Sequence, residues 1–251
     1  MSRLASPAPA GSFAERLEVL EERIEASGVD RAAIKLVAVT KGFGVEAAEA
    51  SMAAGILDLG ENYSSEMLAK AKVLSGRPPG TPTKDDDRVV GCAGRVDEWE
   101  TRAGRTVPRW HFLGALHKRT IRALAPWVSC WQSVCRLSEG EEIARASPGA
   151  RVFVQVDQTQ IPGRNGCRLA ETPELVDSLR ELGLEVSGLM TLGPPGAHDE
   201  VRGVFRSVAA MAHELGLAEV SMGMSDDLEV ALGEGATVLR IGRALFGDRK
   251  G

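Results

Sequence analysis

The sequence has 251 residues, of which 43% are hydrophobic and 26% are charged, and its formal net charge at pH 7 is −5. These values are ordinary for a globular protein, and the length suits either two small domains or one α/β barrel. The mild acidity disfavours a nucleic-acid-binding protein, which usually carries a basic stripe. The sequence contains neither the ~20 consecutive apolar residues of a membrane helix nor a signal peptide. We therefore expect a soluble, cytoplasmic protein without nucleic-acid or membrane partners.

The four cysteines predict neither a disulfide framework nor a metal site. Cys92, Cys130, Cys135 and Cys167 show no CxxC spacing and are not accompanied by a histidine cluster. A chain of this length also buries enough apolar surface to fold without disulfides. Reduced thiols are therefore expected, as is usual in a cytosolic protein.

The first predicted elements are a tail, a helix and a buried strand. Residues 1–11 are rich in Pro, Ala and Ser and are expected to form a flexible tail. Ser12 is a suitable N-cap for a helix to about residue 27, because apolar residues follow at intervals of three and four. Residues 34–40, IKLVAVT, are apolar at nearly every position, which is typical of a parallel strand buried on both faces. The next segment is interpreted as a helix that ends at Gly55.

The alternation of strand and helix continues to the end of the sequence. Further strands are predicted at residues 57–60, 109–114, 127–133, 151–157, 184–191, 218–223 and 236–242. The helices after them are predicted at residues 64–74, 118–125, 136–146, 172–182, 199–215 and 225–233. Eight strands alternating with helices predict a parallel sheet, and eight is the number that closes a (β/α)₈ TIM barrel. The alternative is an open doubly wound sheet, for which the expected GxGxxG after the first strand is missing.

Residues 76–108 interrupt this alternation. They are rich in Gly, Pro and charged residues, and we interpret them as a partly mobile surface excursion that leads into the third strand. The run of aspartates at 85–87 is interpreted as a solvated charge run, because three successive carboxylates cannot all face one ion. Apart from the tail, residues 12–251 are thus predicted to form one barrel domain.

Functional residues of such a barrel are expected at the C-terminal ends of its strands. Lys41 directly follows the first strand, which places its stem against apolar neighbours and its amine at the barrel mouth. Partial desolvation there favours the neutral, nucleophilic form of an amine. Most lysines at strand ends are nevertheless ordinary solvated residues, so Lys41 alone is a weak indication.

The loops after the seventh and eighth strands give the second indication. Barrels commonly bind phosphate there, between backbone N–H groups and a short helix N-terminus. Ser225 is predicted to open a helix, although simple helix capping is the alternative interpretation, and Gly242 lets the backbone approach an anion. Because the eighth strand closes onto the first, this phosphate cradle and Lys41 are expected to be neighbours.

Arg240 is the third indication, because a permanent charge near the end of an apolar strand needs a dedicated partner. That partner is either a pyridine nitrogen, as at some pyridoxal phosphate sites, or a carboxylate such as Glu61. A guanidinium would leave the ring nitrogen unprotonated and the ring a poor electron sink. Asn62 is either a ligand to the ring or a helix cap, and His111 is a core residue or one that supports the site from behind.

Several segments together resemble one known family. KLVAVTKGF, LGENYSSEM, RWHFLGALHKR, GLMTLGPPG and VSMGMSDDLEVALGEGATVLRIGRALFG are similar to the pyridoxal phosphate homeostasis proteins, which share the alanine racemase N-terminal barrel. The resemblance covers about residues 12–248. It implies that Lys41 holds pyridoxal 5′-phosphate as a Schiff base, that Asn62 and Ser221 line the ring, and that Arg240 faces its nitrogen. It further implies that Ser225, Gly242 and residue 243 bind the phosphate.

The full set of predicted cofactor-binding residues comprises Lys41, Asn62, His111, Ser221, Met224, Ser225, Arg240, Gly242 and Arg243. The sequence departs from the family pattern at several positions. In the family, Gln and Asn-Lys usually follow the third strand, where this sequence has His117, Arg119 and Thr120. The family usually has a lysine at the position of Arg164. It usually has a small hydroxyl residue at the position of Arg243. These changes affect any step of cofactor transfer that needs the replaced side chains.

The leading functional hypothesis is a non-catalytic carrier of pyridoxal 5′-phosphate, monomeric, that buffers the cofactor or delivers it to apoenzymes. The alternative is a racemase-like enzyme of low activity. Two-base racemases resemble a larger architecture with a tyrosine from a second domain, whereas this sequence ends after the eighth strand and its one tyrosine is Tyr63. A third class, a Schiff-base aldolase acting on a sugar phosphate, would use Lys41 without a cofactor and would lack the near-visible absorbance.

Overall fold

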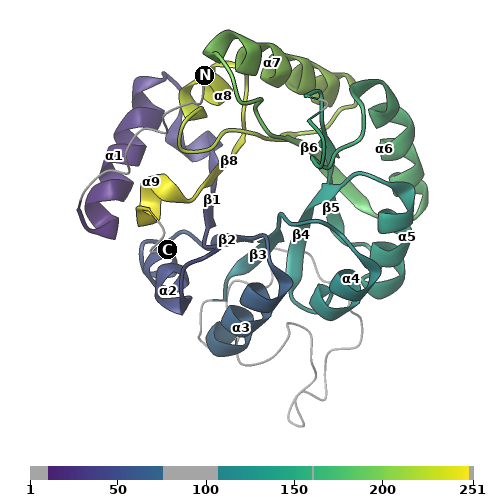
Figure 1. Ribbon diagram of the computed structural model, residues 1–251, viewed down its shortest axis with the longest axis horizontal. Helices are drawn as coiled ribbons and strands as arrows, with labels where there is room; N and C mark the ends of the chain where they lie inside the picture. Colours follow the sequence, from purple (N-terminus) through teal and green to yellow (C-terminus); the bar gives the residue numbers. More distant parts are fainter. Residues whose placement is uncertain (1–10, 76–106, 160, 249–251) are drawn as a thin grey trace.

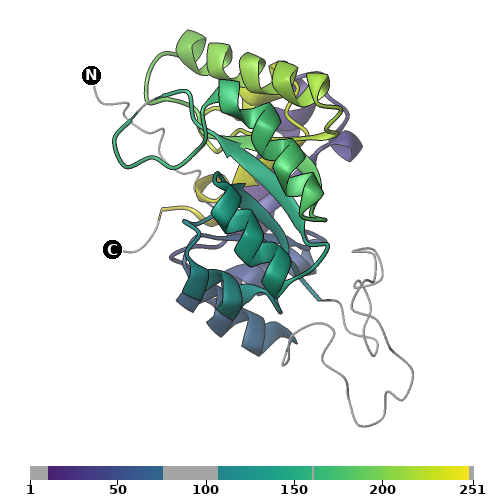
Figure 2. The same ribbon diagram turned by 90° about the vertical axis from the view of Figure 1, so that its right-hand side faces the viewer.

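A closed barrel of eight parallel strands forms the centre of the molecule, and its strands follow one another in chain order (Figure 1). This computed structural model describes residues 11–75, 107–159 and 161–248. The helices lie around the outside of the barrel (Figure 2). The predicted TIM barrel is therefore confirmed, and the open doubly wound alternative is wrong, since β1 pairs with both β2 and β8.

The predicted strands and helices all occur, and none of their boundaries is shifted by more than three residues. The strands are β1 (Lys35–Val39), β2 (Asp58–Glu61), β3 (Arg109–Phe112), β4 (Val128–Val134), β5 (Arg151–Val156), β6 (Glu185–Thr191), β7 (Glu219–Ser221) and β8 (Val238–Ile241). The helices are α1 (Phe13–Ala26), α2 (Val45–Ala53), α3 (Ser64–Ser75), α4 (Lys118–Leu124), α5 (Leu137–Ala146), α6 (Thr172–Glu181), α7 (His198–Glu214), α8 (Leu228–Gly233) and α9 (Arg243–Phe246), with short 3₁₀ turns η1 (Arg31–Ala33) and η3 (Leu169–Glu171).

Local sequence signals begin and end the first helices as expected. Ser12 is the N-cap of α1, where its hydroxyl accepts from the Glu15 N–H while the Glu15 carboxylate accepts from the Ser12 N–H. This reciprocal pair is a capping box, which satisfies two N–H groups that the helix leaves without partners. After α2, Gly55 adopts a φ of 81°, the left-handed conformation that glycine adopts without strain.

The closure between the first and last strands determines which residues meet at the barrel mouth. In the parallel pair β1–β8, Val37 lies opposite Arg240 and Ala38 lies opposite Ile241. Alternate residues of a strand point to the same side of a sheet, so Val37 and Val39 lie on one face of β1, and Lys41 follows two residues after its end. The register thus places Arg240 on the strand next to the one that leads to Lys41.

Two apolar layers hold this arrangement together. The larger one fills the space between the strands and the surrounding helices and includes fully buried Trp131 and Phe205. The smaller one fills the inside of the barrel and consists of Val37, Cys130, Phe153, Met190 and Val238. A TIM barrel has a packed interior rather than a pore, so this inner layer forms the base beneath any site at the mouth.

The predicted helix at 225–233 is wrong in its first turn. Residues 225–227 form a turn, and α8 begins only at Leu228. The Met224 N–H donates to the Asp227 carboxylate at 2.6 Å, which closes the turn in front of the helix. Ser225 therefore does not open α8, and the short helix α9 after β8 is an element that the sequence pattern did not predict.

Two predicted segments fall largely outside the described residues. Of the tail at 1–11 only residue 11 is described, and of the excursion at 76–108 only residues 107 and 108 are described. Within the described part of the chain, none of the helices is long and apolar enough to cross a bilayer.

The inner layer gives a prediction about stability. Phe153→Ala should lower the free energy of unfolding by about 3–5 kcal/mol, because it removes a ring from a fully buried position and leaves a cavity. Val73→Ala, at an exposed position of α3, is the control and should change it by less than about 0.5 kcal/mol. Urea unfolding of both variants measures the difference, and equal small losses would show that the inner layer is not a tightly packed base.

Candidate functional site

The nine predicted cofactor-binding residues lie on, or directly after, five strands that are neighbours around the barrel. In spatial order these strands are β7, β8, β1, β2 and β3. Lys41 follows β1 and Asn62 follows β2, while His111 lies within β3. The remaining six residues belong to β7, β8 and the segments after them, namely Ser221, Met224, Ser225, Arg240, Gly242 and Arg243. The barrel thus gathers residues that are 200 positions apart in sequence into one continuous arc.

The loop that carries half-buried Lys41 lies against the segment after β8. A Cβ atom added at Gly242 would lie 3.2 Å from the Val39 carbonyl oxygen, so the two backbones approach each other closely. Beyond Lys41, the Phe43 ring packs against the Phe246 ring of α9 with centroids 5.1 Å apart. The adjacency of the first and last strands, which the predicted site requires, is therefore present at the level of the backbone.

The segments after β7 and β8 are joined at the N-terminus of α9. The Ala244 N–H donates to the Ser225 hydroxyl at 3.0 Å, and the guanidinium of Arg243 pairs with the carboxylate of Asp226. Ser225 therefore contacts the start of α9 rather than the start of α8, which corrects its predicted place. Met224 is exposed in the same turn. A hydroxyl and the backbone around Gly242 thus face each other across the two segments.

Asn62 has a side-chain oxygen without a partner. Its Oδ1 is buried and accepts no hydrogen bond from any described residue, so the alternative interpretation of Asn62 as a helix cap is wrong. The backbone at this point is tightly fitted, because a Cβ at Gly114 would lie 1.9 Å from the Asn62 carbonyl oxygen. A buried, unsatisfied acceptor costs free energy and is therefore a place where a ligand donor or a water is expected.

Behind Lys41 lies a buried ion pair. The Lys70 amine of α3 donates to Glu61 Oε1 at 2.5 Å and to the Thr40 carbonyl at 2.7 Å, and the Thr40 hydroxyl donates to the same Glu61 oxygen at 2.7 Å. Burial raises the pKa of Glu61, although Lys70 and Thr40 oppose that shift. Since Glu61 pairs with Lys70, the alternative in which Glu61 neutralises Arg240 is wrong.

Arg240 is buried inside the barrel and held by two fixed acceptors. Its Nη1 donates to the Ser221 hydroxyl and its Nη2 to the Thr191 carbonyl, both at 2.8 Å. Burial lowers the pKa of Arg240 to about 10, with Asp227 acting in the opposite direction. The guanidinium therefore still carries its proton at pH 7, and its plane is fixed between β6 and β7.

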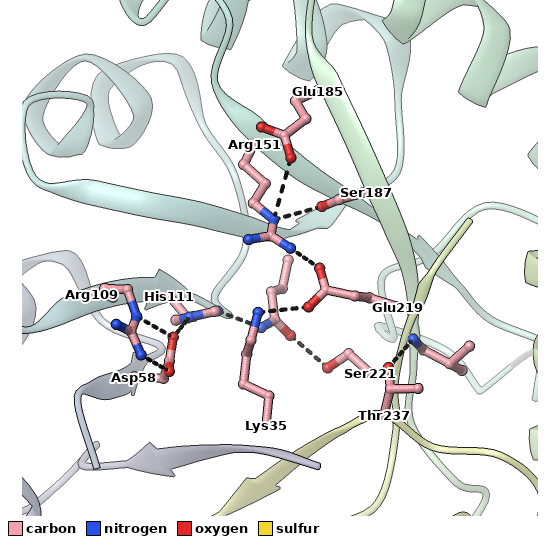
Figure 3. A network of polar contacts seen from close by, with 12 residues as sticks. Lys35, Asp58, Arg109, His111, Arg151, Glu185, Ser187, Glu219, Ser221 and Thr237 are labelled. Carbon is pink, nitrogen blue, oxygen red and sulfur yellow. Dashed lines mark hydrogen bonds and ion pairs between the residues drawn. The ribbon is translucent and has the colours of Figure 1, made fainter. Parts of the chain in front are cut away.

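His111 is buried in a polar network that spans the barrel (Figure 3). Its Nδ1 lies 2.7 Å from the Gln132 amide nitrogen, and its Nε2 lies 2.8 Å from a carboxylate oxygen of Asp58. Arg109 donates to both oxygens of Asp58. Burial opposes ionisation of Asp58, but the hydrogen bonds from His111 and Arg109 outweigh it and hold the pKa of that carboxyl well below its usual range. His111 thus lies deeper than the mouth.

The opposite, N-terminal end of the barrel carries a second polar cluster and a cavity of about 500 Å³. Lys35 donates to Glu219 at 2.6 Å, and Arg151 pairs with the same carboxylate (Figure 3). Because these charges are paired with one another, we interpret the cluster as a structural part of the base of the barrel, where residues that stabilise the fold are more usual than catalytic ones. The predicted site is at the other end.

These features fit pyridoxal 5′-phosphate. The barrel offers a lysine at its mouth, the fixed cation of Arg240 inside it, and an unsatisfied amide oxygen on Asn62. Beside them, the close backbone approach at Gly242 leaves little room for a side chain and the Ser225 hydroxyl faces the start of α9. An aldehyde, an aromatic nitrogen, a ring hydroxyl and a phosphate are the complementary groups of that cofactor.

Comparison with known proteins first defines the class. Residues 11–250 match the family model described as the alanine racemase N-terminal domain, which makes the chain a barrel of that class. An alanine racemase of Clostridium difficile has the same fold at 14% identity and a TM-score of 0.64, over 93% of this chain and 57% of the racemase chain.

Closer relatives define the family, and the chain belongs to the pyridoxal phosphate homeostasis proteins. It is 32% identical to the pyridoxal phosphate homeostasis protein of Pseudomonas aeruginosa, over 92% of this chain and 91% of the relative. The Deinococcus radiodurans protein of that name is 30% identical over 85% of this chain and 88% of the relative. PipY of Synechococcus elongatus, solved with pyridoxal phosphate bound, is 26% identical with a TM-score of 0.73, over 94% of this chain and 100% of PipY.

Sequence reasoning missed the residues that hold the site from behind. Gln132 and Thr191 contact the predicted residues Ser221 and Arg240, and Lys70 contacts Thr40, the residue before Lys41, yet none of the three was predicted. Gln132 did not stand out, because its strand also carries the polar residues Ser129 and Ser133. Thr191 contributes a carbonyl, which no sequence pattern reveals. Lys70 lies on a helix whose polar face looks ordinary in sequence.

The positions that depart from the family pattern occupy the rim. His117 is the N-cap residue of α4 and its side chain makes no capping bond, while Arg119 is exposed. Arg164 donates through both Nη atoms to the Gly193 carbonyl at 3.2 Å, so it ties the segment after β5 to the segment after β6. Arg164 thus has a structural contact of its own.

Asp58 gives a pH-dependent prediction. Its folded-state pKa is depressed, so its contribution to stability is present above the unfolded pKa near ~3.9 and is lost as the pH falls below that value. Asp58→Asn should therefore lower the free energy of unfolding by about 3 kcal/mol at pH 7, because His111 and Arg109 lose a charged acceptor. The difference from the parent should shrink below about pH 4.

Urea unfolding at pH 7 and at pH 3.5 measures this difference. Glu49→Gln, at an exposed position of α2, is the matched control and should be close to the parent at both pH values. A deficit of Asp58→Asn that stays constant or grows on acidification would contradict the assigned ion network.

Proposed function

We propose that this protein binds pyridoxal 5′-phosphate and holds it as a Schiff base on Lys41, to buffer the cofactor or deliver it to apoenzymes. The observation that carries the proposal is that the chain around Lys41 lies against the segment after β8 on both sides of that lysine, through the Val39 carbonyl at Gly242 and through the Phe43 ring at Phe246. It is supported by membership of the family and by the relative PipY, whose structure was solved with pyridoxal phosphate.

Each predicted residue has a role in this proposal. Lys41 supplies the amine, and the bound cofactor supplies an aldehyde that condenses with it, with loss of one water. Arg240 donates to the ring nitrogen, and Asn62 accepts from the ring substituents. The phosphate lies among Ser225, Gly242 and the backbone of Arg243, with Met224 at the edge of this contact. Ser221 and His111 support Arg240 from the inside of the barrel.

The chain's own residues favour storage over rapid turnover. Arg240 keeps its proton at pH 7, so it leaves the ring nitrogen as an unprotonated acceptor and the ring as a poor electron sink. Half-buried Lys41 lies at the mouth, where water can reverse the condensation and release the cofactor. We therefore propose that the protein is a monomeric, cytoplasmic carrier of the cofactor and not a racemase-like enzyme. A racemase-like enzyme would exchange the Cα hydrogen of alanine for deuterium in heavy water.

Lys41→Ala should abolish the near-visible absorbance that the parent develops with pyridoxal 5′-phosphate, because no amine remains at the mouth in its place. Lys118→Ala is the control, since Lys118 is exposed on α4 and pairs with Glu142. The measurement is an absorbance scan before and after borohydride, with the modified peptide mapped. A borohydride-stable adduct that persists in Lys41→Ala at parental level would refute the assignment.

Arg240→Leu should weaken cofactor binding by about tenfold to a hundredfold and shift the absorbance maximum, because a charge-assisted hydrogen bond to the ring is worth about 1.5–3 kcal/mol. Arg202→Leu, which removes an exposed arginine paired with Glu234, is the control. Titration with the cofactor followed by absorbance measures both quantities. An unchanged affinity and absorbance spectrum in Arg240→Leu would contradict the placement of Arg240 beside the ring nitrogen of the cofactor.

A further inference from the structure

A continuous chain of hydrogen bonds connects Arg240 with Asp58 through the inside of the barrel. The Arg240 guanidinium donates to the Ser221 hydroxyl, which donates to Gln132 Oε1 at 2.7 Å. The amide nitrogen of Gln132 bonds to Nδ1 of His111, whose Nε2 bonds to Asp58. The five residues come from five different strands and each is at most 6% exposed. Figure 3 shows part of this path, from Asp58 and His111 across to Ser221.

The two ends of this chain of hydrogen bonds, together with the Gln132 amide, whose oxygen faces Ser221 and whose nitrogen faces His111, determine the direction of every hydrogen bond in it. Arg240 can only donate and an ionised Asp58 can only accept. The Ser221 oxygen therefore accepts from Arg240, and its own proton is turned to the Gln132 carbonyl oxygen. The Gln132 amide must then donate to Nδ1 of His111, and the histidine proton lies on Nε2, facing Asp58. The inside of the barrel thus selects one tautomer of His111.

This direction has an electrostatic consequence. Every lone pair in the chain points toward the cation at Arg240, and every proton points toward the anion at Asp58. The aligned hydroxyl, amide and imidazole dipoles stabilise both buried charges, and in a low-dielectric interior such a network is effective only when all of its members are satisfied. Ser221 alone, without the acceptor at Gln132, could turn its proton elsewhere and offer Arg240 a different lone-pair direction.

We infer that Gln132 and His111 are positioning residues of the cofactor site, which fix the Arg240 guanidinium through the Ser221 hydroxyl. Gln132 belongs to β4, outside the arc of strands that carries the nine predicted residues. Its effect on the ring nitrogen is therefore transmitted by Ser221 and Arg240. The predicted effect of Gln132 on cofactor binding rests on the proposed function. The tautomer of His111, in contrast, can be tested without any cofactor.

The first experiment uses the cofactor-free protein. Long-range ¹⁵N–¹H correlation spectra of its four histidines report which ring nitrogen carries the proton. The chain of hydrogen bonds predicts that Nε2 of His111, a signal identified by its loss in His111→Phe, carries a proton, and that Nδ1 accepts from Gln132 and carries none. In Gln132→Glu the carboxylate can only accept, so His111 should become protonated on both nitrogens. A parental His111 protonated on Nδ1 would overturn the inference.

The second experiment uses the cofactor. Gln132→Met keeps the length of the side chain and removes both hydrogen bonds, so it should weaken cofactor binding by about tenfold and shift the absorbance maximum in the same direction as Arg240→Leu. Lys35→Met is the matched control. It removes a polar contact of the barrel, between Lys35 and Glu219, that is not part of the chain of hydrogen bonds from Arg240 to Asp58. The control should lose stability but keep the parental affinity and absorbance maximum.

The outcomes separate this inference from the proposed function. If borohydride labels Lys41 in the parent but Gln132→Met behaves like Lys35→Met, the positioning role is wrong and the proposed function stands. If Lys41 in the parent is not labelled, the proposed function is wrong, and the ¹⁵N result still decides whether the hydrogen-bond direction is correct. If Gln132→Met does not fold, Gln132→Leu, which likewise removes both hydrogen bonds, replaces it, with the same comparison of affinity and absorbance against Lys35→Met.

Discussion

The pairing of β8 with β1 is the constraint on which the rest of the structure depends. It converts the most distant parts of the sequence into neighbours, so that a lysine after β1 and a helix start after β8 share one rim. The close approach of the Gly242 backbone to the Val39 carbonyl depends on this closure of the barrel. The helices outside and the apolar layer inside stabilise this closure, and neither needs to contact a ligand to do so.

A second constraint follows from closure, because the inside of a small barrel must accommodate whatever charge its strands direct inward. Here an arginine and an aspartate are buried near different levels of the interior, and oriented neutral side chains connect them. Isolated buried charges are costly, and a satisfied network lowers that cost. The same network that makes Arg240 tolerable also fixes its direction, so stability and recognition depend on the same residues.

Much of this architecture could be predicted from the sequence, for reasons that differ from element to element. Buried parallel strands such as IKLVAVT are apolar at nearly every position, and caps such as Ser12 have strong local signals. The turn before α8 was missed because Ser225, Asp226 and Asp227 satisfy the rules for a helix start, while the actual geometry depends on contacts with α9, which is distant in sequence. Gln132 and Thr191 were missed because their roles arise only when separate strands face each other across the barrel.

The most direct test of the account is a crystal structure of the protein after incubation with pyridoxal 5′-phosphate and reduction with borohydride. The account predicts continuous density from the Lys41 amine to the ring, the ring nitrogen at hydrogen-bonding distance from Arg240, and the phosphate between Ser225 and the backbone at Gly242. Density for the cofactor on another lysine, or at the N-terminal end of the barrel beside Lys35, would contradict it.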